Sequence, residues 1–306
     1  SCFDGSETLV VTDRNGTRLV RFDELAGGDL ASLEVLAWRE GQVRPEFLPA
    51  PVITERPYEG EMIRLRTKMG RRLTVTADHP MVVRDGDGVV VKLAGDLTED
   101  DWLPVSLGQP VVDPPVEGRS SLLDAAARAG ITPQQIIVRL SDEQAAAARA
   151  VDLALPGPRR WDARSSKTLR VHELDLLGLS RSGGLAGTTT NGTYVPTELG
   201  LTDECWEMIG LYLAEGHIAA DGARRRVSWS FHPTDEQRLV DQVASFWRGL
   251  GVKVDVRRVS TAMQVSISSR ILAAWIEHEL RAGRDCYSHR IPDQIWTASE
   301  SAKQAL

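Results

Sequence analysis

The chain has 306 residues, 42% of them hydrophobic and 26% charged, with a net charge of −7, which is ordinary for a globular protein of about two domains. It contains no run of about 18 apolar residues, so we expect no membrane span, and its first residues do not resemble a secretory signal. Three scattered cysteines exclude a disulfide framework and a paired-cysteine zinc site, and we therefore expect a cytoplasmic protein.

The negative charge is unevenly distributed. Most of the acidic excess lies in residues 1–107, whereas the rest of the sequence is close to neutral. A net acidic chain disfavours a nucleic-acid partner, but binding depends on a local basic face rather than on the total charge. DNA binding is therefore compatible with this composition if arginines gather on one surface.

Residues 2–107 have the pattern of a compact all-β domain. The Asn15-Gly16 pair is a strong hairpin signal, and it predicts that residues 8–12 pair with residues 18–22. Two further pairs of short β-prone runs flank glycine-containing turns, namely residues 61–67 with 71–76 and residues 81–84 with 89–92. Short strands separated by frequent turns are typical of a small all-β unit.

Residues 108–197 are the least clearly patterned part of the sequence, and we expect a linker and a possible DNA-recognition insert. The proline- and glycine-rich residues 108–118 predict the linker, residues 120–150 have helical periodicity, and the Ser/Gly/Thr-rich residues 180–192 predict a mobile loop. Four arginines here either contact DNA phosphates or form a solvated face: Arg159, Arg160, Arg164 and Arg170.

Helices and strands alternate in residues 198–306. Thr202 is a candidate helix N-cap, and the helix that it begins is expected to end near Gly216. The hydrophobic pattern then predicts strands at 224–231, 252–259 and 263–268 and helices at 234–248 and 270–281. The expected order is αββαββα, an α+β arrangement, of which these runs supply three of the four strands.

Two segments of the β-rich part carry a recognisable motif. Cys2 opens the run CFDGSET, and Thr76-Ala77-Asp78-His79 follows about seventy residues later, at the end of a predicted strand. These segments, together with residues 97–105, resemble the first conserved blocks of inteins, the self-splicing Hint-type domains, which carry a Thr-x-x-His motif. The resemblance implies that residues 2–107 are the N-terminal part of an all-β splicing domain, flanked by host-protein segments (exteins).

The resemblance assigns catalytic roles to Cys2, Thr76 and His79. The Cys2 thiol would attack the preceding carbonyl carbon, an intramolecular N–S acyl shift at the Ser1–Cys2 bond. His79 would protonate the departing amide nitrogen as a general acid, and Thr76 would hydrogen-bond the scissile linkage. Neither a cysteine nor a TxxH tetrapeptide is specific alone; their order, spacing and strand context carry the interpretation.

Residues 209–217, with the sequence IGLYLAEGH, form a second motif. They resemble the signature of LAGLIDADG (DOD-type) homing endonucleases, and the αββαββα order of residues 198–306 resembles the first half of that endonuclease domain. Two such helices cross in that family, which implies close backbone approach at Gly210 and Ala214. The resemblance implies that Glu215 is catalytic and binds Mg²⁺. A glutamate at a helix C-terminus opposes the helix dipole, which is typical of a functional position.

The strands after this motif predict a face that binds double-stranded DNA. Alternation directs apolar residues of 224–231 towards the helices and polar residues towards the opposite face, with the DNA-binding candidates Arg224, Arg226, Gln264 and Ser266. Residues 288–292, SHRIP, resemble the family's Lys-x-Ile-Pro segment, with His289 where a catalytic lysine is common. Either Arg290, a further DNA-binding candidate, replaces that lysine or the nuclease is degenerate.

The sequence contains neither a second LAGLIDADG motif nor the C-terminal splicing blocks of an intein. We therefore expect an incomplete N-terminal portion, whose missing part is supplied in cis or by a separate chain. Two alternatives stay open. One is a LAGLIDADG DNA-binding or maturation protein without splicing activity, and the other is a non-splicing Hint autoprocessing domain of the hedgehog type.

Overall fold

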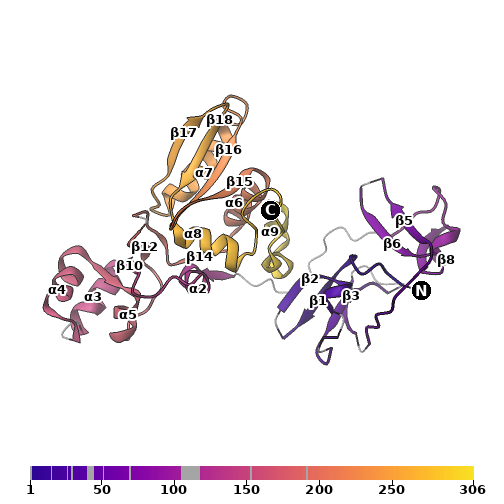
Figure 1. Ribbon diagram of the computed structural model, residues 1–306, viewed down its shortest axis with the longest axis horizontal. Helices are drawn as coiled ribbons and strands as arrows, with labels where there is room; N and C mark the ends of the chain where they lie inside the picture. The colour runs from indigo at the N-terminus through magenta and orange to yellow at the C-terminus, as the bar shows by residue number, and fades with distance from the viewer. Residues whose placement is uncertain are drawn as a thin grey trace. The chain divides into compact units, whose positions relative to one another are not determined.

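The computed structural model describes residues 2–14, 16–25, 27–28, 30–39, 45–50, 52–68, 70–104, 118–151, 154–190 and 192–306. The chain divides into two compact units (Figure 1), Ser1–Pro115 and Val116–Leu306. Each unit has its own hydrophobic core. Both units contain small antiparallel sheets, and most helices lie in the second. The chain as a whole is thus a mixed α+β protein.

The first unit is β-rich. Its described strands are β1 (Thr8–Asp13), β2 (Gly16–Arg21), β3 (Glu34–Ala37), β4 (Glu46–Pro49), β5 (Met62–Arg66), β6 (Arg72–Thr76), β7 (Pro80–Asp85) and β8 (Gly88–Leu93). They form one antiparallel four-stranded sheet, with the order β2-β1-β3-β4, and two separate hairpins, β5–β6 and β7–β8. Two short helices, α1 (Phe22–Leu25) and η1 (Ala94–Asp96), follow β2 and β8.

All three hairpins predicted from the sequence are confirmed. In the first, Asp13 pairs with Gly16, whose φ of +96° requires a residue without a side chain. Strands β3 and β4 were not predicted, because each is only four residues long and neither alternates clearly between polar and apolar residues. They extend the sheet from β1, and the small core beneath it consists of Val11, Val20, Leu25 and Leu33.

The second unit begins with a mixed segment of short helices and strands. Its elements are β9 (Arg119–Ser121), α2 (Leu122–Arg128), β10 (Ile136–Arg139), α3 (Asp142–Val151), α4 (Gly157–Trp161), η3 (Asp162–Ser166), β11 (Thr168–Arg170), α5 (Val171–Leu176), β12 (Leu185–Thr188), β13 (Val195–Pro196) and β14 (Glu198–Gly200). Four of them make an antiparallel sheet with the order β11-β10-β12-β13, and β14 pairs with β9.

Two expectations for this segment are wrong. A strand, β10, interrupts the stretch 120–150 that was predicted to be helical, and β12 lies inside the predicted mobile loop at 180–192, where it pairs with β10. The glycine at 184 allows close packing rather than mobility, because a Cβ there would lie 2.7 Å from the Arg139 carbonyl oxygen. The linker predicted at 108–118 lies, except for Gly118, outside the described residues.

The remainder of the second unit confirms the predicted αββαββα order. Its elements are α6 (Asp203–Glu215), β15 (Gly216–Asp221), β16 (Arg224–Phe231), α7 (Gln237–Gly249), β17 (Asp255–Val259), β18 (Ala262–Ile267), α8 (Arg270–Ala274), η4 (Trp275–Glu279), η5 (Asp293–Thr297) and α9 (Glu300–Ala305). The antiparallel sheet has the order β15-β16-β18-β17. No helix in the described part of the chain combines the length and apolar character needed to cross a bilayer.

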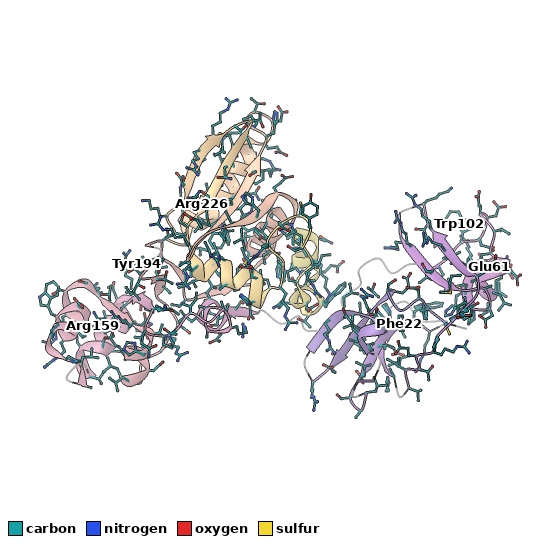
Figure 2. The ribbon with its side chains drawn as sticks, viewed as in Figure 1. Phe22, Glu61, Trp102, Arg159, Tyr194 and Arg226 are labelled. Carbon is teal, nitrogen blue, oxygen red and sulfur yellow. The ribbon has the colours of Figure 1, made fainter. Side chains whose placement is uncertain are left out.

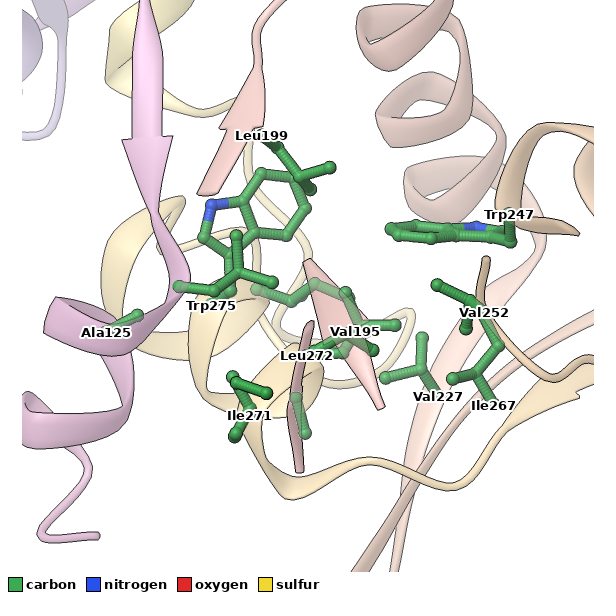
Figure 3. Packing of buried hydrophobic residues seen from close by; sticks show 14 of the residues in the cluster. Ala125, Val195, Leu199, Val227, Trp247, Val252, Ile267, Ile271, Leu272 and Trp275 are labelled. Atoms are coloured by element: carbon green, nitrogen blue, oxygen red, sulfur yellow. The ribbon is translucent and has the colours of Figure 1, made fainter. Parts of the chain in front are cut away.

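One core joins the two parts of this unit. Val195 and Leu199, from the segment before α6, pack in the same cluster as Val227 of the later sheet and Trp275 of η4 (Figure 3). The indole nitrogen of Trp275 also donates a hydrogen bond of 2.7 Å to the Ser120 hydroxyl. Residues 116–197, which the sequence separated from 198–306, therefore belong to the same compact unit.

Candidate functional site

The first residues of the chain pair with the end of strand β6. Phe3 forms an antiparallel bridge with Val75, and the Thr76 amide donates a hydrogen bond of 3.0 Å to the Cys2 carbonyl. Cys2 and Thr76 are therefore neighbours, although 74 positions separate them in the sequence. The strand context that the sequence predicted for this pair of motifs is present.

The Thr76 hydroxyl lies at the centre of this site. Its Oγ1 accepts a hydrogen bond of 2.9 Å from the Cys2 amide, and the side chain is only 1% exposed. A hydrogen bond from the same hydroxyl lowers the pKa of the Asp78 carboxyl to about 2. Because the hydroxyl proton is directed to Asp78, an oxygen lone pair is available to the amide of Cys2.

The sulfur of Cys2 is partly exposed and forms no disulfide. The guanidinium of Arg56 has a raised pKa, chiefly through a hydrogen bond to this sulfur. Sequence reasoning missed Arg56, because it stands in a segment without a motif and far along the chain from Cys2.

His79 follows β6 in the turn that leads to β7. Its amide donates to the Thr76 carbonyl at 3.0 Å, and its carbonyl accepts from the Ala94 amide at 2.8 Å, so its backbone is held on both sides. Burial, and then the charge of the amino terminus, lowers the pKa of His79, whereas the charge of Asp78 opposes that shift. Within the described residues, its Nδ1 is buried and has no hydrogen-bond partner. Cys2, Thr76 and His79 thus lie around one short stretch of paired backbone.

Glu215 is the last residue of helix α6 and is exposed at the surface. Although the residue is exposed, partial loss of water around its carboxyl raises the pKa of Glu215, and the negative charge of Glu236 raises it further. A cation would relieve this repulsion. Among the described residues, no group of three or more His, Cys, Asp or Glu side chains could by itself hold a metal ion. The site fits Mg²⁺ only as one carboxylate completed by water and phosphate oxygens, which is a common way of binding this ion.

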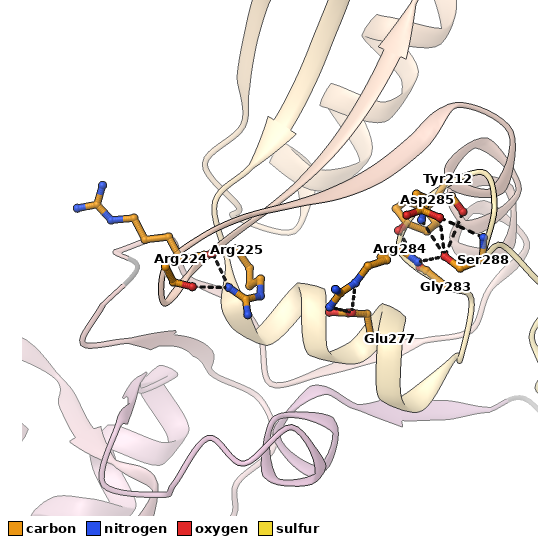
Figure 4. Close-up of polar contacts among 9 residues, drawn as sticks. Tyr212, Arg224, Arg225, Glu277, Gly283, Arg284, Asp285 and Ser288 are labelled. Carbon is orange, nitrogen blue, oxygen red and sulfur yellow. Dashed lines mark hydrogen bonds and ion pairs between the residues drawn. The ribbon is translucent and has the colours of Figure 1, made fainter.

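His289 lies against the end of the same helix. Its Nδ1 donates a hydrogen bond of 2.8 Å to the Leu213 carbonyl oxygen, and no hydrogen-bond partner of its buried Nε2 lies among the described residues. The preceding loop is fixed by a 2.9 Å hydrogen bond from the Tyr212 hydroxyl to the Gly283 carbonyl (Figure 4). The nearby His217 has a pKa lowered by burial and by the charge of His289.

The predicted polar face of the second-unit sheet is only partly open. Arg224 and Arg226 are exposed and Gln264 is half-buried, as expected of surface residues. Ser266, however, is 2% exposed and pairs with Ser228, which is 1% exposed, so the expectation of an open polar row is wrong at this position. The alternation of side chains along a strand predicts the face on which a residue lies. Whether that face is open to solvent depends on the residues that pack over it.

A hollow of about 440 Å³ lies beside this face. Residues of the loop between β12 and β13 line one part of it, and residues of the β15–β16 hairpin and Ser268 line the rest: Thr190, Gly192, Ala219, Ala220, Asp221, Arg224, Arg225, Arg226 and Ser268. Figure 2 labels Arg226 at this sheet, and Figure 4 shows Arg224 extending away from the backbone, whereas Arg225 donates to the carbonyls of Gly222 and Arg224. The hollow is therefore basic.

Gly210 lies against the end of α9 rather than against a second LAGLIDADG helix, so the helix crossing expected at Gly210 stays a prediction. A Cβ on Gly210 would overlap the backbone carbonyl of Leu306, at the end of α9. Helix α9 thus packs directly on α6, whereas Ala214 is exposed. Arg290 is also exposed, and its amide donates to the Ala282 carbonyl at 3.2 Å.

No protein-family model matches the chain. The chain is similar to a protein of Methanocaldococcus jannaschii (strain ATCC 43067 / DSM 2661 / JAL-1 / JCM 10045 / NBRC 100440) named "Uncharacterized protein MJ1054". The two are 24% identical over 316 residues, which are 99% of this chain and 34% of that protein. The chain therefore spans about a third of the length of this relative, whose name states no activity.

Proposed function

We propose that this chain is the N-terminal portion of an intein that carries the first half of a LAGLIDADG-type homing endonuclease. The first unit would then start protein splicing with an N–S acyl shift at the Ser1–Cys2 bond. The second unit would bind double-stranded DNA and contribute one metal-binding carboxylate. The observation that carries the proposal is the 2.9 Å hydrogen bond between the Cys2 amide and the Thr76 hydroxyl, beside His79.

That hydrogen bond involves the nitrogen that must leave. In the acyl shift, the Cys2 sulfur bonds to the carbonyl carbon of Ser1, and the bond from that carbon to the Cys2 nitrogen breaks. The nitrogen becomes an amine by gaining a proton, for which His79 is the nearby acid. Thr76 accepts a hydrogen bond from this N–H and so holds the scissile linkage in one orientation for the attack. The Arg56 guanidinium interacts with the sulfur of this nucleophile through a hydrogen bond.

The second unit supports the nuclease part through charge. Arg224, Arg226 and the hollow between the sheet and the β12–β13 loop present positive charge for phosphate groups. Glu215 would hold Mg²⁺ together with waters and a DNA phosphate. When bound, the ion would lower the pKa of a water molecule and stabilise negative charge at the cleaved phosphodiester.

The test is thiol-dependent cleavage. A reporter protein is fused before Ser1, the purified chain is incubated with dithiothreitol, and release of the reporter is followed by mass spectrometry. The thioester that the acyl shift forms would exchange with the added thiol, so the reporter is expected to be released with Ser1 at its C-terminus. Cys2→Ala is expected to abolish release, whereas Cys286→Ala, which removes another exposed thiol, leaves it unchanged.

Release that persists in Cys2→Ala would overturn the acyl-shift assignment. Absence of release from the unaltered chain, with DNA binding retained, would instead favour a LAGLIDADG DNA-binding protein without splicing activity.

A further inference from the structure

Phe3 stands between two aromatic rings, next to the proposed nucleophile. Its ring stacks on Phe22 with a centroid distance of 4.7 Å and an interplanar angle of 12°. Its other neighbour is the imidazole of His79, at 4.3 Å and 63°, in an edge-to-face arrangement. Such ring pairs have preferred geometries and so restrict the orientations of both partners.

The imidazole of His79 depends on this packing for its orientation. Its backbone is fixed by hydrogen bonds to Thr76 and Ala94, but these do not determine the rotation of the ring. Its buried Nδ1 has no hydrogen-bond partner among the residues that the structure describes, so a carboxylate or carbonyl does not orient it. The ring of Phe3, edge-to-face with the imidazole at 4.3 Å, is placed to restrict its rotation.

We propose that Phe3 is a positioning residue that holds the His79 imidazole in the orientation needed to protonate the Cys2 nitrogen. This inference rests on the proposed acyl shift. Phe3 follows Cys2 directly and forms a β-bridge with Val75. The same backbone pairing therefore positions both Cys2, the proposed nucleophile, and Phe3, the residue that contacts His79. Any displacement of this segment would therefore move both catalytic groups together.

The exposure of Phe3 favours this role over a purely structural one. The side chain is 40% exposed, although the unit has a separate buried core formed by Val11, Val20, Leu25 and Leu33. A phenylalanine that served only folding would be expected in such a core, because removal of apolar area from water is its main contribution. Phe3 instead covers one side of His79.

Phe3 also shapes the charge environment of the imidazole. Burial lowers the pKa of His79, and an aromatic ring in contact with the imidazole contributes to that burial. The charge of the amino terminus of the chain acts in the same direction as burial, and the charge of Asp78 acts in the opposite direction. Removing the ring of Phe3 should therefore let water reach the imidazole and raise the pKa of His79.

The experiment combines a titration with a rate. In a Cys2→Ala background, which cannot react, the ring signals of His79 are titrated by NMR with Phe3 intact and with Phe3→Ala, Phe3→Leu or Phe3→Tyr. The thiol-cleavage rate is measured in the same Phe3 variants with Cys2 present. Leu19→Ala is the control, since Leu19 is a similarly exposed apolar residue of the same unit, at 37%.

We expect Phe3→Ala to raise the pKa of His79 and to slow cleavage by about ten- to a hundredfold, the cost of a misplaced catalytic group. Phe3→Tyr should leave the pKa of His79 and the cleavage rate as they are in the unaltered chain. Phe3→Leu should keep the fold but retain only part of the cleavage rate. Leu19→Ala should change neither. An unchanged His79 titration and an unchanged rate in Phe3→Ala would overturn the positioning role, even if the unaltered chain cleaves. If the unaltered chain does not cleave, the proposed function falls, whatever the titration gives.

Discussion

The amide nitrogen of Cys2 donates a hydrogen bond of 2.9 Å to the hydroxyl of Thr76, whose own proton is directed to Asp78. This connects the start of the chain to the end of β6 through a side chain that is almost completely buried. A buried hydroxyl with both of its hydrogen-bonding functions in use has a fixed orientation. It is therefore suited to hold one atom of a reacting peptide bond.

Thr76→Val should slow thiol-dependent release of an upstream reporter by about tenfold or more, the effect of losing a hydrogen bond worth about 1.4 kcal/mol in the transition state. Valine has the shape of threonine but cannot accept from the Cys2 amide. Thr76→Ser, which keeps the hydroxyl, is the control and should retain most of the rate. Equal rates in the valine and serine variants would show that the hydroxyl has no part in the reaction.

The pKa of His79 also predicts how acid affects the first unit. Burial lowers this pKa below 6.5, the value for an unperturbed histidine, so the unfolded chain binds the proton more readily than the folded one. The stability that neutral His79 contributes to the folded first unit is fully present above pH 6.5. It is lost as the pH falls from 6.5 towards the pKa that His79 has in the folded protein. His79→Gln should remove this part of the pH dependence, measured as the urea midpoint of first-unit NMR signals at several pH values.

His172→Gln, in the second unit, is the control for that titration and should leave the first unit unaffected. Asp78 does not interfere, because its stabilising charge is lost only below its unfolded value of 3.8 and towards its folded pKa of about 2. An identical pH dependence with and without His79 would mean that the imidazole is equally accessible to protons in both states.

Local patterns were sufficient to predict much of the fold. Turn chemistry identified the hairpins, since Gly16 requires a left-handed φ that a turn provides, and periodicity identified the order of elements after Thr202. The mobile loop predicted from the composition of residues 180–192 was wrong, because Gly184 packs against Arg139 of a neighbouring strand. A glycine needed for close packing has the same local pattern as a glycine in a flexible loop.

Candidate site residues could be predicted from the sequence only where they belong to a recognisable motif. Thr76 and His79 belong to a tetrapeptide that can be recognised, but the contacts of Arg56 with Cys2 and of Phe3 with His79 form only when distant segments pair. The burial of Ser266 was unpredictable for a similar reason. Alternation placed it on the polar face, and only the assembled sheet determines that this part of the face is covered.

The exposed carboxylate at the end of α6 leads to a prediction about the nuclease. In a protein completed with a second endonuclease half, Glu215→Gln should abolish Mg²⁺-dependent cutting of target DNA while DNA binding is retained, because the amide cannot replace a charged metal ligand. Glu204→Gln makes the same change at the other end of the helix and should leave cutting intact. Cutting by the Glu215 variant at the unaltered rate would remove Glu215 from the active site.

The basic hollow predicts a particular dependence on salt. If Arg224 contacts a DNA phosphate, Arg224→Gln should lower the slope of log binding constant against log salt concentration by about 1. Fluorescence anisotropy with a duplex of arbitrary sequence measures this slope, since phosphate contacts do not require a specific site. Arg248→Gln, at an exposed position near the end of α7, is the matched control. Equal slopes for both variants would place the DNA away from the hollow.

The packing of α9 on α6 predicts opposite effects for two Gly→Ala substitutions. Gly210→Ala should destabilise the second unit by about 1–3 kcal/mol, because its Cβ would overlap the Leu306 carbonyl and the helices would have to separate. Gly249→Ala, at the end of helix α7, should be neutral or stabilise by up to about 1 kcal/mol, because the added Cβ would meet no atom within 4 Å. Urea denaturation gives both values, and hydrogen exchange of the α9 amides reports the separation directly. If Gly210→Ala is as stable as Gly249→Ala and α9 stays protected, the backbones of α6 and α9 are not in close contact at Gly210.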